Sequence, residues 1–156
     1  MPSGTTRSGD ARDSRTVAAL GLRAAGLVLC LGVAYIHLVD QHFFAFDKRP
    51  GYVLAGYVLL EIAGVVAALL LLLRPGLGPW ALAAGVAAGP LVGFVLSRGP
   101  GLPDYVDDRG NWTEPLGVLS LLVEGVLLVV ALVALRRSTA TVAGPDPRPA
   151  SRAAGS

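Results

Sequence analysis

The chain has 156 residues, of which 53% are hydrophobic and only 15% are charged. A soluble domain carries about 25% charged residues, so this deficit excludes a soluble globular enzyme. Thirteen basic and eleven acidic residues give a net charge of +2, which is too weak to indicate a nucleic-acid partner. The single cysteine, Cys30, excludes an intrachain disulfide and a dithiol redox pair.

Charged residues are concentrated between four long apolar runs. A run of about 20 apolar residues is long enough to cross the hydrocarbon core of a bilayer. We therefore predict an all-α, four-transmembrane-helix bundle whose membrane domain covers residues 17–136. The flanking segments 1–16 and 137–156 are rich in Ser, Thr, Gly, Pro and Arg, which is typical of disordered tails. The predicted spans are residues 17–44, 52–73, 80–97 and 116–135.

The first apolar run is longer than the 7–15 residues or so of a signal-peptide core. We interpret it as a retained helix in which Cys30 is a packing residue. Its outer part carries His37, with Asp40 and Gln41 three and four residues further on, on the same helical face. Haem is not expected, because His42, the other histidine, lies on the same helix. We expect no cofactor.

The second and fourth spans each contain one acidic residue, Glu61 and Glu124. Each glutamate lies nine residues from the predicted outer end of its span, which places both at a depth of about 13–14 Å. Ionisable groups at such depth are costly and mark candidate functional sites. Tyr57 shares a face with Glu61, and Ser120 shares a face with Glu124.

The third span carries small residues at every fourth position. Small residues mark helix–helix interfaces in membranes, because they allow backbones to approach closely. This stripe predicts tight packing, either within the bundle or against another copy of the chain. Its members are Ala81, Gly85, Gly89, Gly93 and Ser97.

The segment between the third and fourth spans is acidic and begins at Arg98. Its oxygen-bearing side chains are of the kind that binds Ca²⁺, but their spacing does not fit an EF-hand loop. We favour a solvated acidic loop over a cation site. The residues concerned are Asp104, Asp107, Asp108, Asn111 and Glu114.

The distribution of basic residues predicts the orientation of the bundle. Nine of them flank the two chain ends and the second connection, and four flank the other two connections. Both termini are therefore predicted to be cytoplasmic. Aromatic residues mark the predicted interfaces, with Tyr52, Tyr105 and Trp112 outside and Trp80 inside.

Together these features predict a polar layer of His37, Glu61, Glu124 and Arg98 in the outer half of the bundle, supported by the hydroxyls of Tyr57 and Ser120. Three uses of this layer remain open. Protonated glutamates can join helices through hydrogen bonds, the layer can handle protons or cations, or His37, Glu61 and Glu124 can bind a metal. One histidine and two carboxylates are a plausible metal set, but no spacing motif supports it.

Three segments resemble small, uncharacterised four-span membrane proteins of actinobacteria. They read Tyr-Ile-His-Leu at 35–38, Leu-Ser-Arg-x-x-Gly-Leu-Pro at 96–103 and Gly-Asn-Trp-Thr-Glu-Pro-Leu-Gly at 110–117. The resemblance extends over residues 34–131 and implies four helices. It also implies that the corner after Arg98 and the turn before Leu116 are family features.

From the sequence we favour a non-catalytic protein of the bacterial inner membrane. It would be a packing or assembly partner, or a minor component of a transport system. Its expected partners are the lipid bilayer and either another copy of the chain or another membrane protein. The alternative is a membrane enzyme, or a metal- or proton-handling protein, that uses His37, Glu61 and Glu124.

Overall fold

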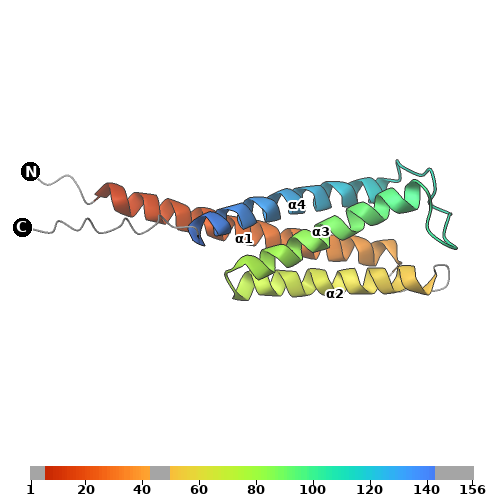
Figure 1. Cartoon of the computed structure of the whole chain (residues 1–156), viewed down its shortest axis with the longest axis horizontal. Helices are drawn as coiled ribbons and strands as arrows, with labels where there is room; N and C mark the ends of the chain where they lie inside the picture. Colours follow the sequence, from red (N-terminus) through yellow and green to blue (C-terminus); the bar gives the residue numbers. More distant parts are fainter. Residues whose placement is uncertain (1–5, 43–49, 143–156) are drawn as a thin grey trace, which may run out of the picture.

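The computed structural model describes residues 6–42 and 50–142. Four helices account for most of this part of the chain: α1 (Thr6–Asp40), α2 (Gly51–Leu73), α3 (Leu77–Arg98) and α4 (Pro115–Val142). They run alternately up and down, so the start of α1 and the end of α4 lie at one end of the bundle and the α3–α4 loop lies at the other (Figure 1). The described residues contain no strand, which confirms the predicted all-α class.

Each helix contains a segment long and apolar enough to cross a membrane: Asp13–Asp40, Gly51–Leu73, Leu77–Arg98 and Pro115–Thr139. These segments confirm the four predicted spans. The chain therefore has the architecture of a multi-pass membrane protein, and lipid contact explains why many large apolar side chains of the bundle are exposed.

The outer helices extend further than the sequence suggested. Residues 6–16, predicted to be a tail, form the first turns of α1, and residues 137–142 continue α4. Polar residues are compatible with helix continuation where no proline intervenes, and the single glycine of these stretches, Gly9, is accommodated within α1. In α4 the hydroxyl of Ser138 donates to the carbonyl of Ala134, and that of Thr139 donates to the carbonyl of Arg136.

The predicted outer end of the first span is also corrected, because α1 ends at Asp40 rather than at residue 44. His42 follows with φ 51°, a left-handed conformation that cannot continue a helix. Residues 43 and 44 lie outside the described part, as do residues 1–5 and 143–156 of the predicted tails.

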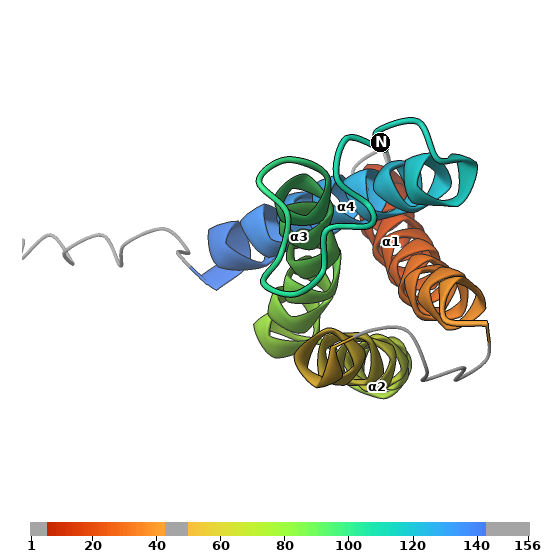
Figure 2. The ribbon, with the colours of Figure 1, turned by 90° about the vertical axis from the view of Figure 1, so that its right-hand side faces the viewer.

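The helices form an uneven bundle. Helix α1 packs on α2 and α4, and α3 packs on the same two helices, whereas α2 and α4 share no contact among the described residues. Helices α2 and α3 lie close together at their short connection and diverge toward the loop end (Figures 1 and 2). This divergence positions the candidate site described below.

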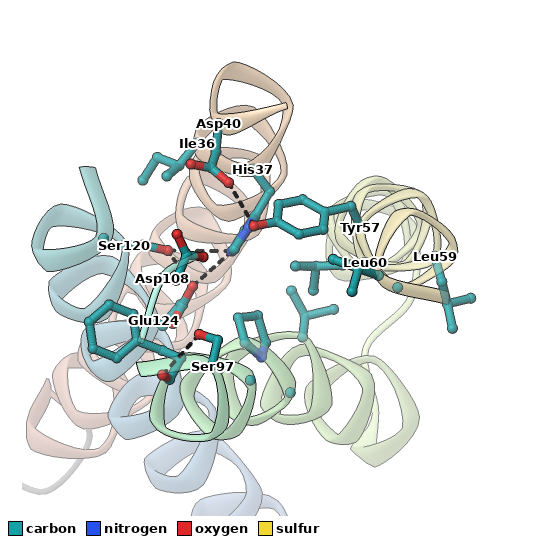
Figure 3. Close-up of a pocket in the computed structure, with 18 of the residues that line it drawn as sticks. Ile36, His37, Asp40, Tyr57, Leu59, Leu60, Ser97, Asp108, Ser120 and Glu124 are labelled. Carbon is teal, nitrogen blue, oxygen red and sulfur yellow. Dashed lines mark hydrogen bonds and ion pairs between the residues drawn. The ribbon is translucent and has the colours of Figure 1, made fainter. Parts of the chain in front are cut away.

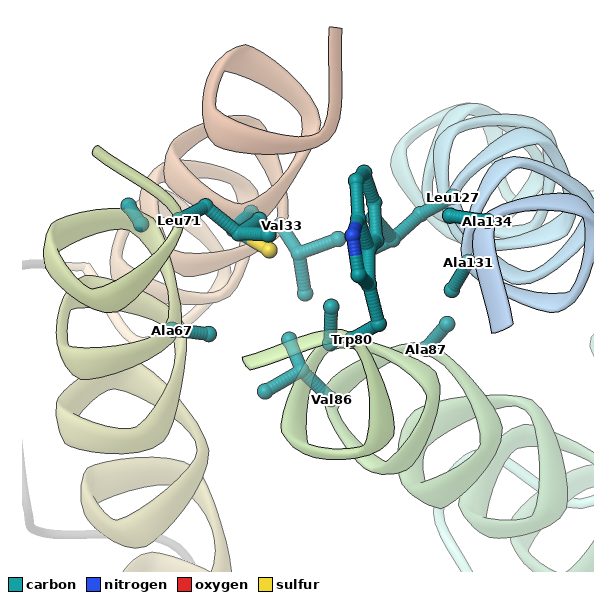
Figure 4. Close-up of a cluster of buried hydrophobic side chains, with 12 residues drawn as sticks. Val33, Ala67, Leu71, Trp80, Val86, Ala87, Leu127, Ala131 and Ala134 are labelled. Atoms are coloured by element: carbon teal, nitrogen blue, oxygen red, sulfur yellow. The ribbon is translucent and has the colours of Figure 1, made fainter. Parts of the chain in front are cut away.

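A hydrophobic core, whose buried side chains are shown in Figure 4, closes the bundle near the α2–α3 connection, which Leu71 and Trp80 flank. Trp80 is buried in this core, so its ring packs between the helices rather than facing the membrane interface. Its indole ring fills the space left by the missing side chain of Gly26 on α1. Cys30 is fully buried in the same core, as expected of a packing residue. The other core members are Val33, Ala67, Ala68, Leu71, Ala83, Val86, Ala87, Leu127, Ala131 and Ala134.

Arg23 joins α1 to the end of α2. Its Nε donates to the carbonyl of Leu71 at 2.8 Å, and its Nη2 donates to the carbonyl of Leu72 at 2.9 Å. These carbonyls belong to the last turn of α2, where backbone acceptors lack partners within the helix. The positive charge of Arg23 also interacts favourably with the negative end of the α2 helix dipole.

Candidate functional site

A cavity of about 500 Å³ lies between the helices, in the part of the bundle where α2 and α3 diverge (Figure 3). All four helices and the α3–α4 loop contribute to its wall. Most of the wall is apolar, with side chains such as Ile36, Leu59, Leu60 and Leu82. One part is polar and contains His37, Asp40, Tyr57, Ser97, Ser120 and Glu124.

The small-residue stripe of α3 lines this cavity. A Cβ atom added to Gly85, Gly89 or Gly93 would meet no atom within 4 Å, so no neighbouring helix packs closely on these glycines. Tight packing within the bundle, one of the two predicted uses of the stripe, is therefore not what the structure shows. The stripe ends at the buried Ser97 and begins at the exposed Ala81. Packing against another copy stays a prediction.

His37, Glu124 and Ser120 form a hydrogen-bonded cluster between α1 and α4. Nε2 of His37 lies 3.0 Å from Oε1 of Glu124 and 3.3 Å from the hydroxyl of Ser120. Ser120 also donates a short hydrogen bond to Oε1 of Glu124, one helical turn away. The Glu124 side chain is 1% exposed and that of His37 is 15% exposed. The predicted proximity of these three residues is present in the structure.

Tyr57 extends the cluster toward α2. Its ring meets the His37 ring edge to face, with the centroids 5.3 Å apart. Its hydroxyl donates to Oδ2 of Asp40 at 2.6 Å, which links α2 to the last turn of α1. Tyr57 therefore supports the polar layer, as predicted, although its hydrogen bond goes to Asp40 rather than to a glutamate.

Glu61 does not join this cluster. Its Oε1 accepts a short hydrogen bond from the amide of Gln41, and Glu61 is not among the residues that line the cavity. The two glutamates share a depth by count, but they lie in separate places around the bundle. The predicted use of Glu61 beside Glu124 is therefore not supported by the geometry.

Arg98 also lies apart from Glu124. Its Nη1 donates to Oδ2 of Asp108 and its Nη2 donates to Oε2 of Glu114, both at 3.1 Å. Further hydrogen bonds go to the hydroxyl of Ser97 and the carbonyl of Asn111, and the guanidinium lies 4.5 Å from the Phe94 ring centroid. The sequence did not indicate these partners. Arg98 fixes the loop at the mouth of the bundle instead of entering the polar layer.

The α3–α4 loop is folded over one end of the cavity. Leu102, Tyr105 and Asp108 contribute to the cavity wall. The hydroxyl of Tyr52, on α2, donates to the carbonyl of Pro103 at 2.6 Å. Gly101 and Gly110 have φ of 83° and 79°, and these left-handed turns are conformations that glycine adopts readily.

The predicted metal set is not assembled. Within residues 6–42 and 50–142, no group of three or more His, Cys, Asp or Glu side chains could hold a metal ion. Glu61 is engaged with Gln41, which leaves only His37 and Glu124 of the predicted ligands together. In the loop, Asp108 and Glu114 are paired with Arg98 rather than arranged around a cation position.

The polar cluster does not have the geometry of a nucleophile triad, although it contains Ser, His and Glu. In such a triad the carboxylate binds one ring nitrogen of histidine and the serine binds the other. Here Glu124 and Ser120 both approach Nε2 of His37, and Ser120 donates to the carboxylate itself. His37 is thus not placed to remove a proton from Ser120 with support from Glu124.

Comparison of the chain with protein families, curated proteins and solved structures finds no match. The resemblance to small actinobacterial membrane proteins stays a prediction. The cavity is the feature that sequence reasoning missed. Its signal was the glycine stripe of α3, which has the same pattern whether a helix packs on it or a space is left beside it.

Proposed function

We propose that the protein is a non-catalytic protein of the bacterial inner membrane that binds a small, largely apolar molecule between its helices, as a component of a transport or carrier system. The cavity of about 500 Å³ carries this proposal. Ligand pockets typically enclose about 300–1,000 Å³, with mostly apolar walls and a few polar groups that orient the ligand. The cluster of His37, Ser120 and Glu124 would supply those polar groups.

A purely structural role for the polar layer accounts less well for this arrangement. Hydrogen bonds that only joined α1 to α4 would be expected within a closely packed interface. Instead, His37, Ser120 and Glu124 all line the open space. The glycines of α3 keep that space free, because a larger side chain at 85, 89 or 93 would extend into it.

The excess of arginine at the chain ends supports an orientation with both termini in the cytoplasm. The α3–α4 loop would then cover the cavity from the outside, and the hydrophobic core would seal it from the cytoplasm. This orientation, the inner-membrane location and the membership of the actinobacterial group are parts of the same proposal.

A fluorescent probe tests whether the cavity binds ligands. N-phenyl-1-naphthylamine is neutral and apolar, and Trp112 can transfer energy to it, because the Trp112 ring lies 6.0 Å from that of the cavity-lining Phe94. We expect saturable binding to the protein in phosphatidylcholine nanodiscs, above the background of empty nanodiscs. Gly89→Leu fills the cavity and should weaken binding about tenfold or more, a loss of 1.4 kcal/mol or more.

The matched control is Gly125→Leu. Gly125 is also a membrane-helix glycine with open space around it, but it does not line the cavity. This variant should bind the probe as the wild type does, and both variants should retain wild-type helical content by circular dichroism. Equal probe affinity in the two leucine variants, or no saturable binding to the wild type, would overturn the proposed function.

A further inference from the structure

We infer that the ligand of this cavity is an amphiphilic amine whose protonated nitrogen binds Glu124. The inference rests on the proposed function, because it names the chemical class that the proposed cavity selects. It follows from three separate features of the wall: one unused carboxylate oxygen, an excess of acidic over basic side chains, and a set of aromatic rings.

The first feature is the second oxygen of Glu124. Both hydrogen bonds of this carboxylate, from His37 and from Ser120, end on Oε1. Oε2 accepts no hydrogen bond from the described residues, and it is not among their fully buried unpartnered atoms, so it keeps some access to the cavity that Glu124 lines. A carboxylate oxygen without a partner in the protein is free to accept a hydrogen bond from a ligand. A hydrogen-bond donor on a ligand in the cavity could bind this second oxygen of Glu124.

The second feature is the charge of the wall. Four acidic side chains line the cavity, Asp40, Asp108, Glu114 and Glu124, against two basic ones, His37 and Arg98. Arg98 donates four of its five N–H groups, to Asp108, Glu114, Ser97 and the carbonyl of Asn111, and its charge is paired with the two carboxylates. A carboxylate or phosphate ligand would therefore meet a cation that is already paired, whereas an ammonium group would be attracted by Asp40 and Glu124.

The third feature is aromatic. Tyr52, Tyr57 and Tyr105 contribute to the wall, and aromatic rings favour cations through their negative faces. The apolar portion of the wall, with Leu59, Leu60 and Leu82, would receive a hydrocarbon body. The combination of a long apolar wall and one acidic, aromatic end matches a molecule that is a hydrocarbon with an amine at one end.

Three compounds with the same phenylbutyl body separate charge from apolarity: 4-phenylbutylamine, pentylbenzene and 5-phenylpentanoate. Each is titrated against N-phenyl-1-naphthylamine bound to the protein in phosphatidylcholine nanodiscs near neutral pH. These lipids have no net charge, so the membrane does not itself attract the amine by charge. We expect the amine to displace the probe at a concentration about tenfold lower than either of the other compounds, as one charge-assisted hydrogen bond would provide.

Glu124→Gln tests the assignment to this residue. Glutamine retains the size and hydrogen-bonding capacity of the side chain but removes its negative charge. The variant should bind the neutral probe as before and lose most of the advantage of the amine. Glu61→Gln is the matched control, since Glu61 lies outside the cavity wall and should leave the amine's advantage unchanged.

The outcomes distinguish this inference from the function on which it rests. If the probe binds but pentylbenzene displaces it as well as the amine does, the cavity is a general apolar site, and the amine inference is wrong while the proposed function stands. Stronger displacement by 5-phenylpentanoate, or an unchanged amine advantage in Glu124→Gln, would also overturn the inference. Loss of saturable probe binding itself would count against the proposed function instead.

Discussion

Replacing Arg98 by methionine should destabilise the protein by about 2–3 kcal/mol, because it removes the cation that holds Asp108 and Glu114 at the mouth of the bundle. Loss of one partner of a fully buried ion pair costs about 3–5 kcal/mol. The Arg98 side chain is 11% exposed, but its partners are 27% and 30% exposed, so solvation of the freed carboxylates should reduce the loss. Methionine keeps an unbranched apolar side chain at this position but removes the guanidinium, and with it both ion pairs and the contact of the cation with the Phe94 ring.

The free energy of unfolding can be measured by SDS titration in mixed micelles. Arg109→Met is the control, because Arg109 lies in the same loop and is exposed. It should change the midpoint little, since exposed charged groups contribute about 0–1 kcal/mol. The loop should also become more sensitive to thermolysin in Arg98→Met, since the arginine links the end of α3 to residues 108, 111 and 114. Equal stability of the two variants would show that Arg98 does not hold the loop.

The fold was readable from the sequence because the bilayer requires nearly uninterrupted apolar helices. All four spans were placed from hydropathy, with turns at Pro50 and around Gly76. The helix ends were harder to predict, because hydropathy indicates where the apolar segment ends rather than where the helix ends. Mostly polar residues at 6–16 and 137–142 continue α1 and α4 beyond the apolar segments; neither stretch contains proline, and Gly9 does not end α1.

The candidate site was only partly predictable, for a geometric reason. Counting residues gives depth along a helix at 1.5 Å per residue, but it does not fix the rotation of one helix against another. Glu124 turned out to face His37, whereas Glu61 pairs with Gln41 outside the cavity wall. Rotation is decided by packing, and here it depends on contacts such as that of Gly64 with the carbonyl of Cys30.

Trp80 shows that contacts between helices in the core could not be predicted from the sequence either. Tryptophan is frequent at membrane interfaces, so its place near the start of a span indicated an interfacial role. The structure instead buries it against Gly26 of α1, a residue 54 positions earlier in the sequence. Nothing local in either segment identifies this pair, because the space for the indole exists only after α1 and α3 have met across the bundle.

This pairing leads to the second large effect, expected for Gly26→Ala. A Cβ atom at residue 26 would lie 2.7 Å from Cζ3 and 2.9 Å from Cη2 of Trp80, and 3.1 Å from Cδ1 of Leu71. The indole is buried among the side chains of the core, so a movement of the ring must displace its neighbours. Overpacking of this kind costs about 1–3 kcal/mol, which exceeds the gain of up to 1 kcal/mol or so from replacing a helical glycine by alanine.

Gly21→Ala is the matched control, on the same helix and with no atom within 4 Å of the added Cβ. It should leave the free energy of unfolding unchanged or slightly higher, so that the two alanine variants differ by the packing cost alone. A second substitution tests the cause. Trp80→Leu removes the atoms that clash, and in that background Gly26→Ala should cost much less than it does in the wild type. A double-mutant cycle measures this coupling directly, and an additive result would mean that Gly26 is not required for the indole.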